Sequence, residues 1–149
     1  VLYPLQSLRK EEVKDILEVP LFIEWSNDSV KSKLHDLADS ISNRVREVNS
    51  TQRKEYHLAA VFANNFTNAM YTIANDYLVK QGLEFDNLLP IIQETALRLK
   101  KGEPAVWQTG PAMRGDNAVI DKHLEMLDNE ELQSLYSKLS VYIKNRHHS

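Results

Sequence analysis

The chain has 149 residues, enough for one ordinary domain, and its content of 42% hydrophobic and 26% charged residues is typical of a globular protein. The formal net charge of -3 and the scattered basic residues argue against a nucleic-acid-binding surface. No apolar run approaches the roughly 20 residues that a membrane-spanning helix needs. Cysteine is absent, which excludes disulfides and suits a reducing compartment, so we expect a cytoplasmic protein.

The N-terminal part predicts short strands and one helix. Residues 1–5 (VLYPL) and 19–25 (VPLFIEW) are β-rich, and residues 7–18 favour a helical turn or two between them. From Asn27 or Asp28, either of which could serve as the N-cap, apolar residues recur at helical spacing. That apolar set is Val30, Leu34, Leu37, Ala38, Ile41 and Val45. Residues 45–48 then predict a brief strand.

The next helix is expected to dominate the protein. It begins near residues 49–51 and can run to Gly82, a plausible C-terminal stop, which gives roughly 30 residues and about 45 Å of helix. Its middle is apolar or small on most sides, and a helix of that kind is usually buried all round. A domain of this size would expose part of it, so we expect a homodimer.

Three further helices are predicted in the C-terminal part. One begins at Asp86 or Asn87, with core positions at Leu88, Ile92, Thr95, Ala96 and Leu99. One begins at Asp116, and the last near Asp128 with Glu131 in the capping-box position. The last helix places Leu132, Leu135, Tyr136, Leu139 and Tyr142 on one face. The predicted fold is therefore mainly α: short N-terminal strands followed by a helical bundle with one long central helix.

Two features could carry chemistry. His57, Asn64 and Asn68 fall on one stripe of the long helix, with Asn65 to its side. They are either buried polar groups that pair with each other or across a dimer, or groups that hold a small molecule. The five histidines form no metal-ligand motif, and we expect no metal site.

The second feature is residues 108–116 (QTGPAMRGD). Gly110 and Gly115 permit positive φ or a close backbone approach, and Asp116 can cap the following helix. Together with Arg114, the free N–H groups at that helix start would form an anion-binding corner. The alternative is a tight turn in which Arg114 pairs with Asp116 and nothing binds.

Four runs of the sequence are similar to a known family: YHLAAVFANNFTNAMYTIA (56–74), LLPIIQETA (88–96), QTGPAMRGD (108–116) and IDKHLEML (120–127). They resemble the C-terminal half of a family of uncharacterised Rossmann-like reductases related to pyrroline-5-carboxylate reductases and 6-phosphogluconate-type dehydrogenases. The resemblance implies that residues 1–48 are the last strands and helix of a truncated nucleotide-binding domain. Residues 49–149 would be an all-α substrate and dimerisation domain, like the C-terminal domain of 6-phosphogluconate dehydrogenase.

The resemblance also implies roles for individual residues. His57 would act as acid/base and Asn64 would orient a small anionic substrate. The nicotinamide cofactor would lie near Pro4 and Gln6, and Tyr3 stands where the family often has His. The remaining substrate-binding residues would be Asn68, Thr109, Gly110, Arg114 and Asp116.

One motif is missing from the sequence. The chain has four glycines and no G-x-G-x-x-G run, the signature of a dinucleotide-binding turn. We therefore expect NADP or NAD to serve the full-length protein, and this chain alone to bind neither cofactor and to be inactive. The main hypothesis is the substrate and dimerisation part of a nicotinamide-dependent reductase. The alternative is a non-catalytic helical module whose long helix only dimerises.

Overall fold

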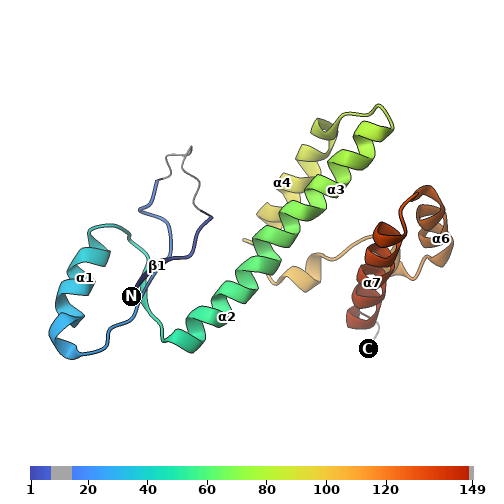
Figure 1. The fold of residues 1–149 in the computed structure, drawn as a ribbon. Coiled ribbons are helices and arrows are strands. Elements are labelled where there is room, and N and C mark those ends of the chain that lie inside the picture. The colour runs from blue at the N-terminus through green and yellow to red at the C-terminus, as the bar shows by residue number, and fades with distance from the viewer. Residues whose placement is uncertain (8–14, 148–149) are drawn as a thin grey trace. The chain divides into compact units, whose positions relative to one another are not determined.

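The structure is a computed structural model that describes residues 1–7 and 15–147. It divides into two compact units, Val1–Phe85 and Asp86–Ser149, which are described one at a time. The first unit holds a three-stranded sheet and the long helix, and the second holds helices (Figure 1). The chain is thus mainly α, as the sequence predicted. Most of the predicted helical turn over residues 7–18 lies outside the described residues.

The unit boundary differs from the boundary expected between the two functional parts. The units separate after the long helix, whereas the sequence placed the change from nucleotide-binding to substrate-binding parts between residues 48 and 49. The observed division reflects packing within the chain, and the predicted one concerns function. The functional boundary therefore stays a prediction.

A small sheet lies at the centre of the first unit. Its strands are β1 (Leu2–Pro4), β2 (Leu21–Ile23) and β3 (Val45–Glu47). The central strand β2 runs antiparallel to β1 and parallel to β3. All three residues of β2 are buried, as expected of a strand that is covered on both faces.

The two faces of β2 pack against different helices. Leu21 and Ile23 form the core with Ala38 of α1 (Lys31–Asp39). Successive side chains of a strand point to opposite faces, so Phe22 lies on the other side. There its ring lies 4.7 Å from that of Tyr56, on the long helix, and 6.4 Å from that of Tyr3.

The first predicted helix is shorter than its apolar spacing suggested. A 3-10 turn, η1 (Asp28–Val30), precedes α1, and Asn27 accepts a hydrogen bond from the Ser29 hydroxyl instead of capping a backbone N–H. The helix ends at Asp39, and Val45 lies in β3, which confirms the predicted brief strand. Val30 and Leu37 are exposed, contrary to the predicted apolar face.

The helix ends where it does because of the turn that follows it. The buried Ser42 hydroxyl donates to the carbonyl of Val19 at 2.6 Å and accepts from the backbone N–H of Arg44 at 3.0 Å. These bonds fasten the turn to the segment before β2. The chain therefore leaves the helical path before Val45.

The long helix is confirmed, with one irregularity. It comprises α2 (Ser50–Ala60), the π-helical segment η2 (Val61–Phe66) and α3 (Thr67–Lys80), which form one continuous rod (Figure 1). A capping box between Asn49 and Gln52 begins it, and Gly82 follows its end at φ 68°. At the start of α3 the Thr67 hydroxyl donates to the carbonyl of Phe62 in the π segment, five residues earlier.

A polar clamp ties the start of α2 to the end of β2. The carboxylate of Glu24 accepts hydrogen bonds from the backbone N–H of Ser50 at 2.8 Å, from the Ser50 hydroxyl and from the Arg53 guanidinium. The hydrogen bond from Arg53, followed by those from Ser50, lowers the pKa of Glu24 below its ordinary 4.5. A negative charge at the start of a helix is also favoured by the helix dipole.

The second unit holds the remaining elements. They are η3 (Phe85–Leu88, which begins at the last residue of the first unit), α4 (Leu89–Arg98), η4 (Pro104–Trp107), α5 (Pro111–Arg114), α6 (Asn117–Met126) and α7 (Glu130–His147). α5 packs against α7 and α6, with Ala112 buried. Gln133 of α7 donates its amide to the carbonyls of Leu124 and Leu127, which closes the end of α6.

Two predictions in this unit need correction. The Asn129 side chain accepts from the backbone N–H of Leu132, so the last helix is capped one residue later than predicted and Glu131 is not in the capping-box position. Thr95, Ala96, Leu99, Leu139 and Tyr142 were expected on core faces but are exposed. Periodicity identifies one apolar side of each helix, but it does not say how much of that side the rest of the chain covers.

We predict that Glu24→Gln lowers the thermal melting temperature by a few degrees at neutral pH, because it removes the charge that Arg53 and Ser50 bind. A carboxylate whose pKa is lowered on folding stabilises the fold above its ordinary pKa, and this stabilisation is lost as pH falls through the folded value. The difference in melting temperature between the wild type and the variant should therefore shrink below about pH 4.5.

The matched control for this melt is Glu55→Gln. Glu55 is exposed on the same helix, and within the described residues nothing pairs with its side chain, so the control should melt like the wild type. If Glu24→Gln melted like Glu55→Gln at every pH, the clamp would contribute nothing to stability.

Candidate functional site: a polar hollow between β1 and the long helix

A hollow of about 310 Å³ lies within the first unit, beside the end of β1. β1 and the segment that follows it supply one wall, and α2 and the π segment supply the other. The lining residues are Tyr3, Leu5, Gln6, Ser7, His57, Ala60, Val61, Asn64 and Asn65. Three predicted site residues, Gln6, His57 and Asn64, are thus brought together although they come from distant parts of the sequence.

A tyrosine–histidine pair crosses the hollow. The Tyr3 hydroxyl lies 3.0 Å from Nδ1 of His57, so the two side chains share a hydrogen bond. Tyr3 is held from behind by its stacking on Phe22 of β2, and Phe22 also packs on Tyr56, the neighbour of His57. With Nδ1 occupied by Tyr3, Nε2 is the ring nitrogen that a second partner could use.

The π segment supplies the amides. Asn64 and Asn65 both lie in it and both line the hollow, whereas Asn68 lies beyond it and does not. A π segment uses i→i+5 hydrogen bonds in place of i→i+4, so residues beyond it are rotated relative to a regular α-helix. Of the predicted stripe of His57, Asn64 and Asn68, the hollow therefore includes the first two.

None of the described residues that line the hollow carries a charged side chain. Of its polar groups, the Gln6 side-chain oxygen accepts from the backbone N–H of Ser7 at 2.9 Å. Pro4, the other predicted cofactor residue, sits in β1 opposite Leu21 and does not line the hollow. The remaining amide and hydroxyl groups suit an uncharged polar ligand, which could both donate and accept hydrogen bonds.

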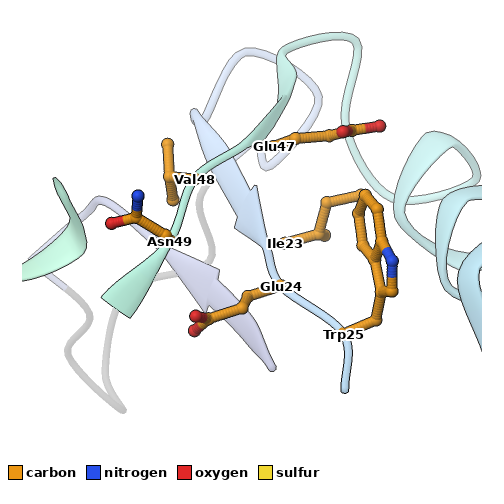
Figure 2. A pocket seen from close by; sticks show the side chains of 6 residues that line it. All are labelled: Ile23, Glu24, Trp25, Glu47, Val48 and Asn49. Atoms are coloured by element: carbon orange, nitrogen blue, oxygen red, sulfur yellow. The ribbon is translucent and has the colours of Figure 1, made fainter. Parts of the chain in front are cut away.

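A second hollow of about 300 Å³ lies at the carboxyl ends of β2 and β3 (Figure 2). Figure 2 shows Glu24 and Trp25 leaving β2 in opposite directions. Glu24 belongs to the clamp on α2, and Asn49 belongs to the capping box. Glu47 pairs with His35 at 2.8 Å and with Lys31 at 3.7 Å, and Lys31 also lies over the Trp25 ring. Because its polar groups already serve the fold, we interpret this hollow as structural.

The predicted anion corner belongs to the second unit. Gly110 has φ 104° and Gly115 has φ 69°, and they flank the one-turn helix α5. A Cβ at either position would meet no atom within 4 Å, so their positive φ, and not a close approach, requires glycine. Asp116 caps α6 by accepting from the backbone N–H of Val119, as predicted.

Arg114 is exposed, and its side chain has no ion pair or hydrogen bond within the described residues. The pairing of Arg114 with Asp116 that we considered as an alternative is therefore not formed. The neighbouring Thr109 uses its carbonyl to accept from the Gln108 amide. Because Arg114 and His57 lie in different units, a site shared by the two stays a prediction.

Membrane-spanning helices and metal sites are both absent from the described residues. None of the helices there combines the length and the apolar character that crossing a membrane would take. No group of three or more His, Asp or Glu side chains in that part of the chain is placed to bind a metal ion.

Comparisons with known proteins identify the family of this chain. The model of the domain of unknown function DUF2520 matches residues 19–143. The chain belongs to this family. No curated protein matches it.

Two solved structures are similar to the chain. One, named "putative NADP oxidoreductase", comes from Bacteroides fragilis: it is 46% identical over 97% of this chain, with a TM-score of 0.92. The other comes from Thermotoga maritima and is 23% identical over 99% of this chain, with a TM-score of 0.74, a likeness that shows the fold. The chain spans 56% and 60% of these two proteins, respectively.

Several lining residues were not predicted as site residues: Tyr3, Leu5, Ser7, Ala60, Val61 and Asn65. The position of Tyr3 directly before the Pro-Leu-Gln turn was noted, but its partner lies 54 residues away and the sequence gives no signal of the pairing. Asn65 would have been found by treating the two adjacent asparagines in an apolar helix as one polar site.

Proposed function

We propose that this chain is the substrate-binding and dimerisation part of an NADP-dependent oxidoreductase. The observation that carries the proposal is the Tyr3–His57 pair, which opens on a hollow lined by the amides of Asn64 and Asn65. A histidine with one nitrogen oriented by a partner and the other available is suited to proton transfer. The similarity to the Bacteroides fragilis protein supports the choice of cofactor.

The residues of the hollow fit only one end of such a cofactor. Amide and hydroxyl side chains with no charge among them can bind the carboxamide of a nicotinamide ring, and we assign Gln6, with Pro4 nearby, to that end. A pyrophosphate needs a glycine-rich turn between a strand and a helix, and the glycines at 82, 102, 110 and 115 provide none. Residues other than these glycines and the residues that line the hollow would hold the pyrophosphate.

The chemistry follows from this arrangement. A bound nicotinamide supplies or accepts the hydride. When a carbonyl or imine carbon of the substrate gains a hydride, its oxygen or nitrogen must gain a proton, and His57 would deliver that proton through Nε2. Asn64 would orient the same polar group by hydrogen bonding. In the oxidation direction His57 would take up the proton.

Arg114 would bind an anionic group elsewhere on the substrate. Its guanidinium is exposed and without a partner in the described part of the chain, so it is available for a bidentate bond to a carboxylate. The adjoining Thr109, Gly110 and Asp116 shape the turn that presents it, and Asn68 would contact the substrate from the long helix. These proposed roles imply that the substrate is a small anion with a carbon that can be reduced or oxidised.

A homodimer accounts for the apolar side of the long helix. Leu58, Phe62 and Phe66 follow one another at four-residue spacing and are 60%, 62% and 50% exposed. Phe62 and Phe66 both belong to the π segment, and their rings pack edge to face at 5.2 Å, so the two side chains lie side by side. An apolar surface of this kind is usually covered, and the second copy of a symmetric dimer would cover it.

The proton-transfer role predicts the behaviour of His57→Gln in the complete protein. Glutamine keeps hydrogen-bonding capacity but cannot exchange a proton, so NADPH should bind as in the wild type while substrate-dependent NADPH oxidation falls by about 10²- to 10⁴-fold. Fluorescence titration measures the binding and loss of NADPH absorbance measures the oxidation. Wild-type oxidation rates in the variant would show that His57 is not the proton donor, whereas a wild-type protein that oxidises no NADPH would favour the non-catalytic helical module.

For Arg114 we predict that Arg114→Ala in the complete protein leaves the melting temperature unchanged but raises the substrate KM. Loss of a charge-assisted contact typically costs about 1.5–3 kcal/mol, which corresponds to roughly 10- to 150-fold. Arg114→Lys should recover part of the loss, since an ammonium cannot reproduce the planar guanidinium. A destabilised Arg114→Ala protein with unchanged KM would assign Arg114 to the fold.

The dimer predicts that Phe66→Asp shifts the protein toward monomer, because it puts a charge in the apolar contact between two copies. Light scattering at tens of micromolar protein measures the mass. Val106→Asp is the matched control: Val106 is 75% exposed and lies in η4, in the other unit, so this variant should keep the wild-type mass. A monomeric wild-type protein at that concentration would refute the dimer.

A further inference from the structure

The described part of the chain contains two tyrosine–histidine hydrogen bonds with different surroundings. Tyr136 bonds Nδ1 of His123 at 2.8 Å between α7 and α6, where the two rings meet edge to face. Tyr3 bonds Nδ1 of His57 at 3.0 Å, and both of these residues line the hollow beside β1. The first pair joins two packed helices, whereas the second borders a space that a ligand can enter.

The direction of the Tyr3–His57 bond decides what His57 can offer to that space. A phenol loses its proton near pH 10 and an imidazolium near pH 6.5, so the favourable arrangement between neutral partners has the phenol donating and the imidazole nitrogen accepting. Among the described residues, His57 is also the sole partner of the Tyr3 hydroxyl. With Nδ1 accepting, the proton of the neutral ring must be on Nε2.

We propose that Tyr3 is a positioning residue, which holds neutral His57 in the Nε2–H tautomer so that it donates a hydrogen bond to a ligand in the hollow. The inference rests on the function proposed above and narrows it. The ligand atom that meets His57 is then an acceptor, such as the oxygen of a carbonyl or the nitrogen of an imine. In a reduction the Nε2 proton passes to this atom as the neighbouring carbon gains the hydride, and the Tyr3 phenol proton moves to Nδ1, so the ring stays neutral. In the oxidation direction both proton transfers run in reverse.

The other residues around the pair agree with this role. Phe22, which is 4% exposed, stacks on the Tyr3 ring and limits its movement. Among the lining residues that the structure describes, the remaining polar side chains belong to Gln6, Ser7, Asn64 and Asn65, and none of them is a charged group that would compete for the imidazole. The tautomer of His57 is therefore determined by Tyr3.

The test is the tautomer of His57 in the ¹⁵N-labelled chain, read from the ¹⁵N shifts of its two ring nitrogens at about pH 8.5, where a histidine is neutral. The His57→Gln variant identifies the signals. We expect wild-type His57 to have an unprotonated Nδ1 and a protonated Nε2. In Tyr3→Phe, which keeps the ring on Phe22, both shifts should move toward the averaged values of a tautomer mixture.

The second pair provides the matched control. Tyr136→Phe should change the ring nitrogens of His123 and leave those of His57 as in the wild type, while Tyr3→Phe should leave His123 unchanged. Equal melting temperatures of Tyr3→Phe and the wild type would show that the shifts do not come from unfolding.

The inference is overturned if wild-type His57 is already a tautomer mixture or carries its proton on Nδ1, or if Tyr3→Phe leaves its shifts unchanged. This outcome is distinct from failure of the proposed function. The tautomer is read in the absence of cofactor and substrate, so it can be as expected even if His57→Gln has no effect on NADPH oxidation.

Discussion

The arrangement of the first unit depends on how the carboxylate of Glu24 holds the start of the long helix. Glu24 ends the central strand, and its bonds to Ser50 and Arg53 fix where α2 begins relative to the sheet. Seven residues into that helix, His57 meets the Tyr3 hydroxyl of β1. Tyr56 packs on Phe22 between these two contacts, so the helix is held to the sheet at three successive points.

The π segment supplies the two amide side chains with which the long helix lines the hollow. A regular helix would continue with the hydrogen-bond pattern of α2, and its polar stripe would include Asn68. The wider turns of Val61–Phe66 instead bring Asn64 and Asn65 together into the hollow. Such segments cost regular hydrogen bonds and occur frequently at functional sites. Here the π segment begins one helical turn after His57, whose hydrogen-bond partner Tyr3 lies in β1.

The two hollows of the first unit show why size alone does not identify a site. They have nearly the same volume, about 300 and 310 Å³. In the hollow beside Trp25, the carboxylate of Glu24 binds the start of α2, and that of Glu47 pairs with His35 and Lys31. In the hollow beside Tyr3, the amides of Asn64 and Asn65 have no partner within the described residues. Both residues are exposed, so their amides are available to a ligand that enters the hollow.

Local signals in the sequence predicted the elements that depend on near neighbours. Asn49 begins the long helix, Gly82 ends it and Asp116 caps α6, because each acts within a few residues of itself. The alternation of short apolar runs also predicted the strands. His57 and Asn64 were identified because polar residues are unusual in an otherwise apolar helix, whereas Gln6 was implied by the family resemblance.

What could not be predicted depends on distant partners. Glu24 and Arg53 are 29 residues apart, and Tyr3 and His57 are 54 apart, so neither pair follows from spacing. The π segment depends on the wider hydrogen bonds that the backbone forms between Val61 and Phe66, and no residue type announces it. Nor does periodicity reveal that Leu58, Phe62 and Phe66 remain exposed, since coverage is a property of the assembled protein.

The central claim is that ligand chemistry takes place in the hollow between β1 and the long helix. A crystal structure of the complete protein with bound NADP tests it most directly. The account predicts that the nicotinamide ring lies against this hollow, with His57 and Asn64 within hydrogen-bond reach of it or of the substrate beside it. A nicotinamide bound away from these residues, for example in the hollow beside Trp25, would contradict the account.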